Sequence, residues 1–136
     1  MKTKLYYIFL GLAIILFISN CNTPKKISNS EIKEEPVVIK NDSLEYEIII
    51  LDIGFNQYLN TIAQPVGYYT QAYLENRNRF LVPIWNSRVS DPTRFNPNIY
   101  QNIIDYNANI NYGYDVNYKL FNYFQFAQRK YRMTLR

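Results

Sequence analysis

Histidine is absent from the 136-residue chain, and cysteine occurs once, as Cys21. Without an imidazole, the chain lacks the side chain that titrates near neutral pH and most often binds zinc. One cysteine forms neither an intrachain disulfide nor a cysteine metal cluster. These absences exclude histidine-based catalysis, histidine metal sites and a fold held together by disulfides. We expect no cofactor.

The chain also lacks an apolar run long enough to cross a membrane comfortably. Its longest run, LYYIFLGLAIILFI at residues 5–18, has roughly 14 residues, whereas a bilayer requires about 20. Lys2 and Lys4 precede the run. A short apolar core after basic residues is typical of a signal peptide. We therefore expect residues 1–20 to be a signal peptide.

The tetrapeptide ISNC at residues 18–21 resembles a bacterial lipobox, in which a branched apolar residue and a small residue precede the cysteine that receives lipid. Asn20 stands where a lipobox has Gly or Ala. Two or three acyl chains, at about 0.8 kcal/mol per buried CH₂, hold a protein firmly on a membrane. The resemblance predicts a lipoprotein anchored through Cys21. The alternatives are ordinary signal-peptide cleavage and an uncleaved anchor lengthened by the flanking residues.

A strong excess of charge is absent from the mature chain. The formal charge of the whole chain is +4, from 15 basic and 11 acidic residues. Removal of residues 1–20 takes away Lys2 and Lys4 and leaves 13 basic against 11 acidic residues, or +2. So small an excess does not support binding to nucleic acid.

The remaining chain divides into a tether and one small domain. Residues 22–43 are polar, mixed in charge and interrupted by Pro24 and Pro36. Such a segment buries too little apolar surface to offset the entropy of ordering it. We therefore expect lipidated Cys21 and a flexible tether over residues 21–43. Residues 44–136 are long enough for a single small α+β domain, mainly helical with one or two short strands.

The first half of this domain shows one strand and two helices. Residues 45–53 are rich in β-branched side chains and predict a strand, buried on both faces across residues 48–51. Apolar side chains from Phe55 to Ile62 recur at helical spacing. A wide apolar stripe over residues 68–85, with Glu75 and Arg79 spaced as an ion pair, predicts a helix that ends or kinks at Pro83.

The last part of the chain predicts a long aromatic-rich connection and a third helix. Asp115 is a plausible N-cap residue, and a core line follows it at Val116, Leu120, Phe124, Ala127 and Tyr131. Basic residues near the end of this helix suit the helix dipole. The alternation of Tyr131, Met133 and Leu135 predicts a terminal strand that pairs with the first strand, with Glu45 and Glu47 opposite Arg132 and Arg136.

Several phrases of this domain resemble a family of small lipoproteins of the Bacteroidetes group, catalogued as a domain of unknown function. The phrases are Asp52 with Gly54-Phe55, YLEN at 73–76, Trp85-Asn86 and GYDVNYKLF at 113–121. The resemblance implies an envelope location and supplies no activity. In that group, acidic residues just after the cysteine mark surface export, and residues 22–26 contain none. This implies retention at the outer membrane, facing the periplasm.

Residues 104–118 repeat a phrase three times: Ile-Asp-Tyr, Ile-Asn-Tyr and Val-Asn-Tyr, each six residues after the last. Three copies are too few for a β-helix, and the third falls inside the predicted helix. The same stretch alternates Asp105, Asn107, Asn109 and Asn111, as oxygen ligands do in a calcium loop. The match breaks at Ile110 and Val116, so exposed Asx turns are the favoured interpretation and calcium binding the alternative.

The candidates for catalysis are five scattered carboxylates: Asp52, Glu75, Asp91, Asp105 and Asp115. A hydrolase of the glycosidase kind requires two carboxylates close together. Asp52 is the best placed, although accepting backbone hydrogen bonds at the strand-to-helix turn explains it more simply. We expect no enzymatic activity.

Binding is the more credible class of function. Tyr and Trp offer flat apolar faces with polar tips, and Asn and Arg add hydrogen-bonding arms. The first candidate surface is Trp85 with Asn86 and Arg88, just after Pro83. We expect a membrane-anchored, non-enzymatic envelope accessory or protein-binding module. The main alternative is a glycan- or peptidoglycan-binding domain, and the weaker one is a carboxylate-based hydrolase.

Overall fold

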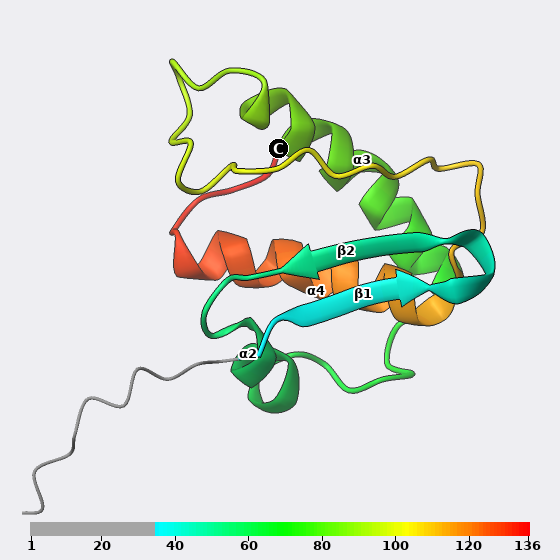
Figure 1. The fold of residues 1–136 in the computed structure, drawn as a ribbon. Coiled ribbons are helices and arrows are strands. Elements are labelled where there is room, and N and C mark those ends of the chain that lie inside the picture. Colours follow the sequence, from blue (N-terminus) through cyan, green and yellow to red (C-terminus); the bar gives the residue numbers. More distant parts are fainter. Residues whose placement is uncertain (1–34) are drawn as a thin grey trace, which may run out of the picture. The chain divides into compact units, whose positions relative to one another are not determined.

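A computed structural model describes residues 35–136, which belong to one compact unit of three helices and a two-stranded sheet (Figure 1). This confirms the predicted small α+β domain. The expected signal peptide, Cys21 and residues 22–34 of the expected tether lie outside the described residues. The elements are β1 (Val37–Asn41), a 3₁₀ turn η1 (Asp42–Leu44), β2 (Tyr46–Ile50), α2 (Phe55–Thr61), α3 (Gln71–Val89) and α4 (Gly113–Lys130).

The two strands form an antiparallel hairpin, in which Ile39 pairs with Ile48 and Val37 with Ile50. The expectation that the tether extends to residue 43 is therefore wrong, because residues 37–43 form β1 and η1. The predicted pairing of β2 with the C-terminal tail is also wrong, because β2 pairs with β1 and residues 131–136 form no strand. Ile39 of β1 is 0% exposed, and its burial orders this strand.

Only one face of β2 is buried, contrary to the expectation that both faces are. Ile50 packs in the core, whereas Ile49 is 52% exposed. Just beyond the strand, Leu51 and Ile53 are 71% and 68% exposed. The residues alternate as in a sheet with one covered face, so the sheet presents an apolar outer surface.

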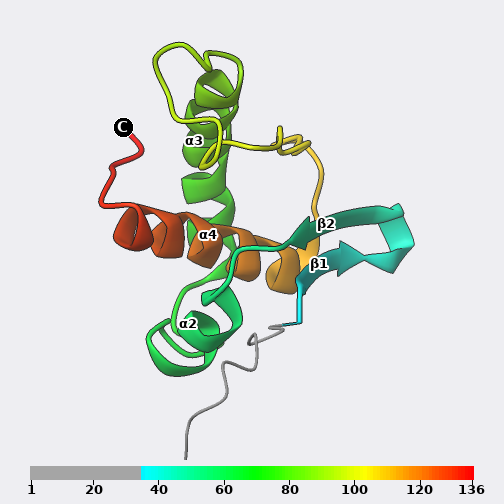
Figure 2. The same ribbon diagram turned by 60° about the vertical axis from the view of Figure 1, so that its left-hand side comes forward.

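Helix α4 is the centre of the domain and packs against β1, α2 and α3. Figures 1 and 2 both show α3 on one side of α4 and α2 on the opposite side. The predicted core line at Val116, Leu120, Phe124 and Ala127 is confirmed, since all four side chains are buried. The predicted N-cap is wrong: α4 begins at Gly113, and Asp115 lies in its first turn, 2.8 Å from Lys119.

Helix α3 does not end at Pro83 but continues for six residues to Val89. A proline inside a helix costs about 3 kcal/mol or more, through a lost hydrogen bond and a clash. Burial of Leu81, Val82 and Trp85 on either side of the proline offsets that cost. The predicted ion pair in this helix is replaced by another contact, in which Gln71 donates a hydrogen bond of 2.7 Å to Glu75.

Helix α2 begins at Phe55, as predicted, and the chain turns into it at Gly54. Gly54 has a φ of +95°, which glycine adopts without strain. Phe55 is 0% exposed and its ring packs against Tyr123 and Phe126 of α4. The turn therefore places the end of β2 directly beside the C-terminal half of α4.

Candidate binding site

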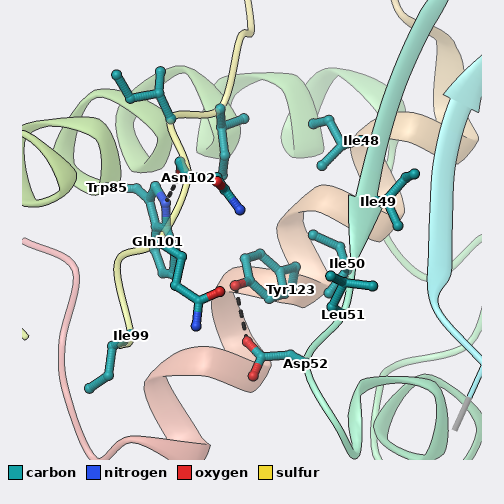
Figure 3. Close-up of a pocket in the computed structure, with 12 residues that line it drawn as sticks. Ile48, Ile49, Ile50, Leu51, Asp52, Trp85, Ile99, Gln101, Asn102 and Tyr123 are labelled. Atoms are coloured by element: carbon teal, nitrogen blue, oxygen red, sulfur yellow. Dashed lines mark hydrogen bonds between the residues drawn. The ribbon is translucent and has the colours of Figure 1, made fainter. Parts of the chain in front are cut away.

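A cleft of about 120 Å³ lies between β2 and the irregular connection after α3 (Figure 3). In both ribbon views, the connection runs beside the edge of β2 that β1 does not occupy (Figures 1 and 2). Among the hydrogen bonds of the described residues, none joins residues 99–104 to the backbone of β2. The lining residues are Ile48, Ile49, Ile50, Leu51, Asp52, Trp85, Ile99, Gln101, Asn102, Ile103, Ile104 and Tyr123.

Trp85 lies at the floor of this cleft and is only 2% exposed. Its Nε1 donates a hydrogen bond of 3.0 Å to the carbonyl of Asn102. Its ring packs edge-on against Tyr100 and Tyr123, at centroid distances of 4.9 and 5.4 Å. The expectation that Trp85 presents an exposed face for binding is therefore wrong, because its helical position points it into the core.

Asn86 and Arg88, the other two residues of that predicted patch, hold the connection in place. The amide of Asn86 forms two hydrogen bonds of 2.8 Å with the backbone of Ile104, one as donor and one as acceptor. Arg88 donates hydrogen bonds of 2.7 Å to the Tyr100 hydroxyl and to the carbonyl of Thr134. These two side chains therefore fix the connection, whose residues 99–104 form one wall of the cleft.

Asp52 closes the end of the cleft and ties β2 to α4. One carboxylate oxygen accepts hydrogen bonds from the Tyr131 hydroxyl at 2.5 Å and from the Lys130 ammonium at 3.0 Å. The other accepts from the Tyr123 hydroxyl at 3.1 Å (Figure 3). The prediction that this carboxylate caps backbone N–H groups is wrong. Its main-chain carbonyl accepts the Phe55 N–H instead, at 3.1 Å.

The donors around Asp52 hold their protons more tightly than usual. Burial, with the charge and hydrogen bond of Asp52, raises the pKa of Tyr123 and of Tyr131. Burial by itself lowers the pKa of Lys130, but the hydrogen bond and charge of Asp52 outweigh it and the net shift is upward. One carboxylate thus binds two neutral phenols and one cation at neutral pH.

Asp52 is the single carboxylate that lines this cleft. The paired carboxylates that glycoside hydrolysis uses are therefore not brought together there. Glu75 bonds to Gln71, and Asp91 and Asp115 pair with neighbours on the surface. Within residues 35–136, no three or more carboxylates lie close enough together to hold a metal ion.

The outer walls of the cleft are apolar and open to solvent. Ile49 and Leu51 stand on the β2 side, and Ile103, which is 64% exposed, stands on the opposite side. Exposed apolar side chains clustered around a groove are typical of a surface that binds another molecule. The cleft combines this feature with an open strand edge.

Two of the four predicted calcium ligands, Asn107 and Asn111, form local turn hydrogen bonds. The side-chain oxygen of Asn107 accepts the N–H of Asn109, at 2.9 Å. That of Asn111 accepts the N–H of Gly113 at 2.9 Å and an amide hydrogen of Gln71 at 2.8 Å. The bonds from Asn107 to Asn109 and from Asn111 to Gly113 each join residue i to residue i+2, as in Asx turns. The interpretation of Asn107 and Asn111 as Asx-turn residues is confirmed, and their side-chain oxygens already accept hydrogen bonds.

The tyrosines of the repeated phrase fix the connection and the loop before α3 against α4. Tyr106 stacks on Tyr112 with ring centroids 4.9 Å apart, and its hydroxyl donates to Asn117 at 2.8 Å. Tyr118 donates a hydrogen bond of 2.6 Å to the carbonyl of Gln64. The phrase therefore reflects aromatic packing and turns, as the sequence suggested.

Tyr123, Lys130 and Tyr131 were missed as partners of Asp52. Helical spacing marks Tyr123 and Tyr131 as eight residues apart and hence on one face of α4. This spacing shows that the two tyrosines share a face of α4, but it does not show which element packs against that face. Lys130 was explained by the helix dipole, whereas its ammonium reaches Asp52 and the carbonyl of Ile53.

Comparison with protein families places the chain in a family of unknown function, DUF6146, whose model matches residues 8–136. The chain therefore belongs to this family, and the resemblance to an uncharacterised family is confirmed. Comparisons with the curated proteins and with the solved structures found no significant match. Within residues 35–136, no helix is both long and apolar enough to span a membrane.

Proposed function

We propose that this member of the family is a lipoprotein, anchored through Cys21 at the outer membrane facing the periplasm, whose domain is a non-enzymatic protein-binding module. The lipobox-like residues 18–21 and the apolar run before them support the anchor. The open edge of β2 beside an apolar cleft supports the binding role. This edge is the observation on which the proposal rests.

An extended segment of a partner protein fits this edge. A strand edge presents unpaired N–H and C=O groups, which pair with an added strand and supply affinity. Side chains that alternate along the added strand then meet Ile49 and Leu51 on one side and Ile103 on the other. The partner's segment is therefore extended and carries apolar, β-branched residues.

A small-molecule substrate fits this site less well. The cleft of about 120 Å³ is a shallow groove along a strand edge, whereas most small-molecule pockets are enclosed and hold a few hundred Å³. Its one carboxylate already accepts three hydrogen bonds, so it has little freedom to act as a base. These two features favour binding of a protein partner over catalysis on a small-molecule substrate.

The anchor is tested by palmitate labelling of the wild type beside Cys21→Ala, with the mass of the mature protein determined. We expect label and a mass shift on the wild type alone. Equal absence of label in both proteins would contradict the anchor and would leave the apolar run at residues 5–18 as a signal-anchor.

The binding module is tested by a photo-crosslinking amino acid at Leu51, which is 71% exposed on the rim of the cleft. The matched control places the same amino acid at exposed Thr93, in the loop after α3. We expect a discrete protein adduct from position 51 alone, reduced by the added substitution Ile49→Lys. Equal adducts from both positions would contradict the proposal.

A pull-down with isolated peptidoglycan tests the glycan alternative. The exposed rings of α3, Tyr73 at 44% and Phe80 at 59%, are the aromatic surface that this alternative needs in place of Trp85. Retention on peptidoglycan that Tyr73→Ala abolishes would favour the glycan function over the protein module.

A further inference from the structure

A second surface of the domain carries apolar residues and no charge. From Ile53 to Leu74 the chain runs for 22 residues without a single Asp, Glu, Lys or Arg. This segment contains α2 and the loop that leads to α3. Its exposed large apolar side chains before α3 are Ile53 at 68%, Ile62 at 50%, Val66 at 73% and Tyr68 at 63%. We call α2 and residues 62–68 the α2 face.

The loop of the α2 face is held in one conformation. The N–H of Tyr68 bonds to the carbonyl of Pro65 at 3.0 Å, and Gly67 has a φ of +90°. A positive φ at the third of four residues is the requirement of a type II turn, with Val66 at its tip. The Gly67 N–H also bonds to the Tyr114 hydroxyl, at 2.8 Å. The exposed apolar side chains therefore project from a fixed turn of the chain.

Cations border this apolar face. Arg129 and Lys130 line a cavity of about 380 Å³ together with Tyr58, Ile62 and other residues of α2 and α4. Lys130 pairs with Asp52, whereas Arg129 is exposed and is absent from the ion pairs within residues 35–136. The uncharged α2 face therefore has a net positive border. Apolar and tyrosine side chains beside the guanidinium of Arg129, unpaired within the described domain, match the border between the acyl chains and anionic headgroups of a membrane.

The described chain begins on the same side of the domain. In both ribbon views, the start of β1 and α2 lie on the side of α4 opposite α3 (Figures 1 and 2). Fourteen residue steps separate Cys21 from Glu35. At about 3.5 Å per step they reach at most ~50 Å. A lipid on Cys21 therefore keeps the α2 face close to the bilayer, where weak contacts are populated.

We propose that the α2 face docks on an anionic phospholipid surface, with Ile62, Val66 and Tyr68 at the acyl boundary and Arg129 over the headgroups. This inference rests on the proposed lipid anchor, which limits the distance between the domain and the membrane. The docked domain turns the loop after α3 away from the bilayer and leaves the cleft beside β2 accessible. The surface that binds lipid is thus distinct from the surface proposed for the protein partner.

The full lipidated chain, reconstituted in phosphatidylethanolamine–phosphatidylglycerol vesicles, tests this docking. An environment-sensitive fluorophore is placed on Val66→Cys and, as the matched control, on Thr93→Cys. Brominated lipids then report contact with acyl chains. An interfacial face sinks about 5–10 Å into the headgroup region, so we expect at least about twofold stronger quenching at position 66 than at 93. Adding Arg129→Glu or raising the salt concentration should lower the difference.

Three outcomes would overturn the docking. The first is equal quenching at both positions, and the second is quenching at position 66 that neither Arg129→Glu nor salt reduces. The third is a label at position 66 that is shielded from water but is not quenched by brominated lipid. The last outcome would mean that a protein covers the face. The mass of the reconstituted chain decides the anchor separately. If Cys21 carries no lipid, the anchor fails, but the apolar run still holds the chain at the vesicle. A fluorophore that attaches to the free Cys21 thiol is then present in both variants. The difference in quenching between positions 66 and 93 therefore still decides the docking.

Discussion

Asp52→Asn should destabilise the domain more than any surface substitution of the same kind. The Asp52 side chain is 17% exposed and accepts hydrogen bonds from Tyr123, Lys130 and Tyr131. Asparagine has nearly the same shape but keeps one acceptor oxygen, loses the charge and turns an N–H group toward a hydroxyl. At least one buried donor then lacks a partner, and the ion pair with Lys130 disappears.

The size of this effect follows from the bonds that are lost. A hydrogen bond to a charged group contributes about 1.5–3 kcal/mol, and the partly exposed Lys130 pair adds little because solvent screens it. We expect the free energy of unfolding to fall by about 2–3 kcal/mol, and at about 4–8 °C per kcal/mol the melting temperature to fall by roughly 8–24 °C. Urea unfolding followed by far-ultraviolet circular dichroism measures the change.

Two further variants make the result interpretable. Asp91→Asn changes a carboxylate whose Arg94 partner lies 3.9 Å away at the surface, and an amide oxygen can still accept a hydrogen bond from the exposed Thr93 hydroxyl, so its expected cost is below about 0.5 kcal/mol. Tyr123→Phe, alone and combined with Asp52→Asn, forms a double-mutant cycle whose coupling energy should exceed about 0.5 kcal/mol. If Asp52→Asn costs no more than Asp91→Asn, or if the cycle shows no coupling, the cluster does not join β2 to α4 energetically.

Three other predictions concern the core. Trp85 is the single tryptophan and is 2% exposed, so iodide should quench its fluorescence weakly until denaturant is added; equal quenching in both states would contradict its burial. Asn117→Ala should cost about 2–3 kcal/mol in urea unfolding, because Asn78 and Tyr106 lose their acceptor, whereas exposed Asn60→Ala should cost below about 0.5 kcal/mol. Burial raises the pKa of Tyr106 to about 12 and also raises that of Tyr46 and Tyr123. Unfolded tyrosines titrate near about 10, so the folded chain binds more protons above that pH, and stability should fall as the pH rises further; a flat urea midpoint between about pH 9 and pH 11.5 would refute this.

The sequence predicted the helices better than it predicted the strands. The helical spacing of Val116, Leu120, Phe124 and Ala127 depends on residues within one element, and the structure confirms it. Strand pairing depends on which distant segment arrives beside β2. The alternation at residues 131–135 predicted the partner strand there, and residues 37–41 were assigned to the tether, although their β-branched run Val37-Val38-Ile39 suits a strand. Burial of Ile39 against α4 decides the pairing, and the sequence contains no direct sign of that contact.

The sequence predicted some residues of the candidate site but not the site itself. It predicted an exposed patch at Trp85, Asn86 and Arg88 and treated Asp52 separately, whereas the structure buries Trp85 at the floor of the cleft and bonds Asn86 to the connection. The error arose from Pro83, which was expected to end or kink the helix just before an exposed Trp85. Because α3 continues to Val89, Trp85 keeps its helical direction into the core. The exposed wall is instead aliphatic, at Ile49 and Leu51, where the sequence predicted a strand buried on both faces.

The contact between Asp52 and Lys130 joins the two proposed surfaces. Asp52 lines the cleft beside β2, and Lys130 lines the cavity of the α2 face, with 3.0 Å between carboxylate and ammonium. A substitution at either residue alters both surfaces and the stability of the domain together. Loss of partner binding in Asp52→Asn therefore does not distinguish a damaged cleft from an undocked domain. Ile49 and Val66 each belong to one surface and take no part in this contact, so variants at these positions separate partner binding from membrane docking.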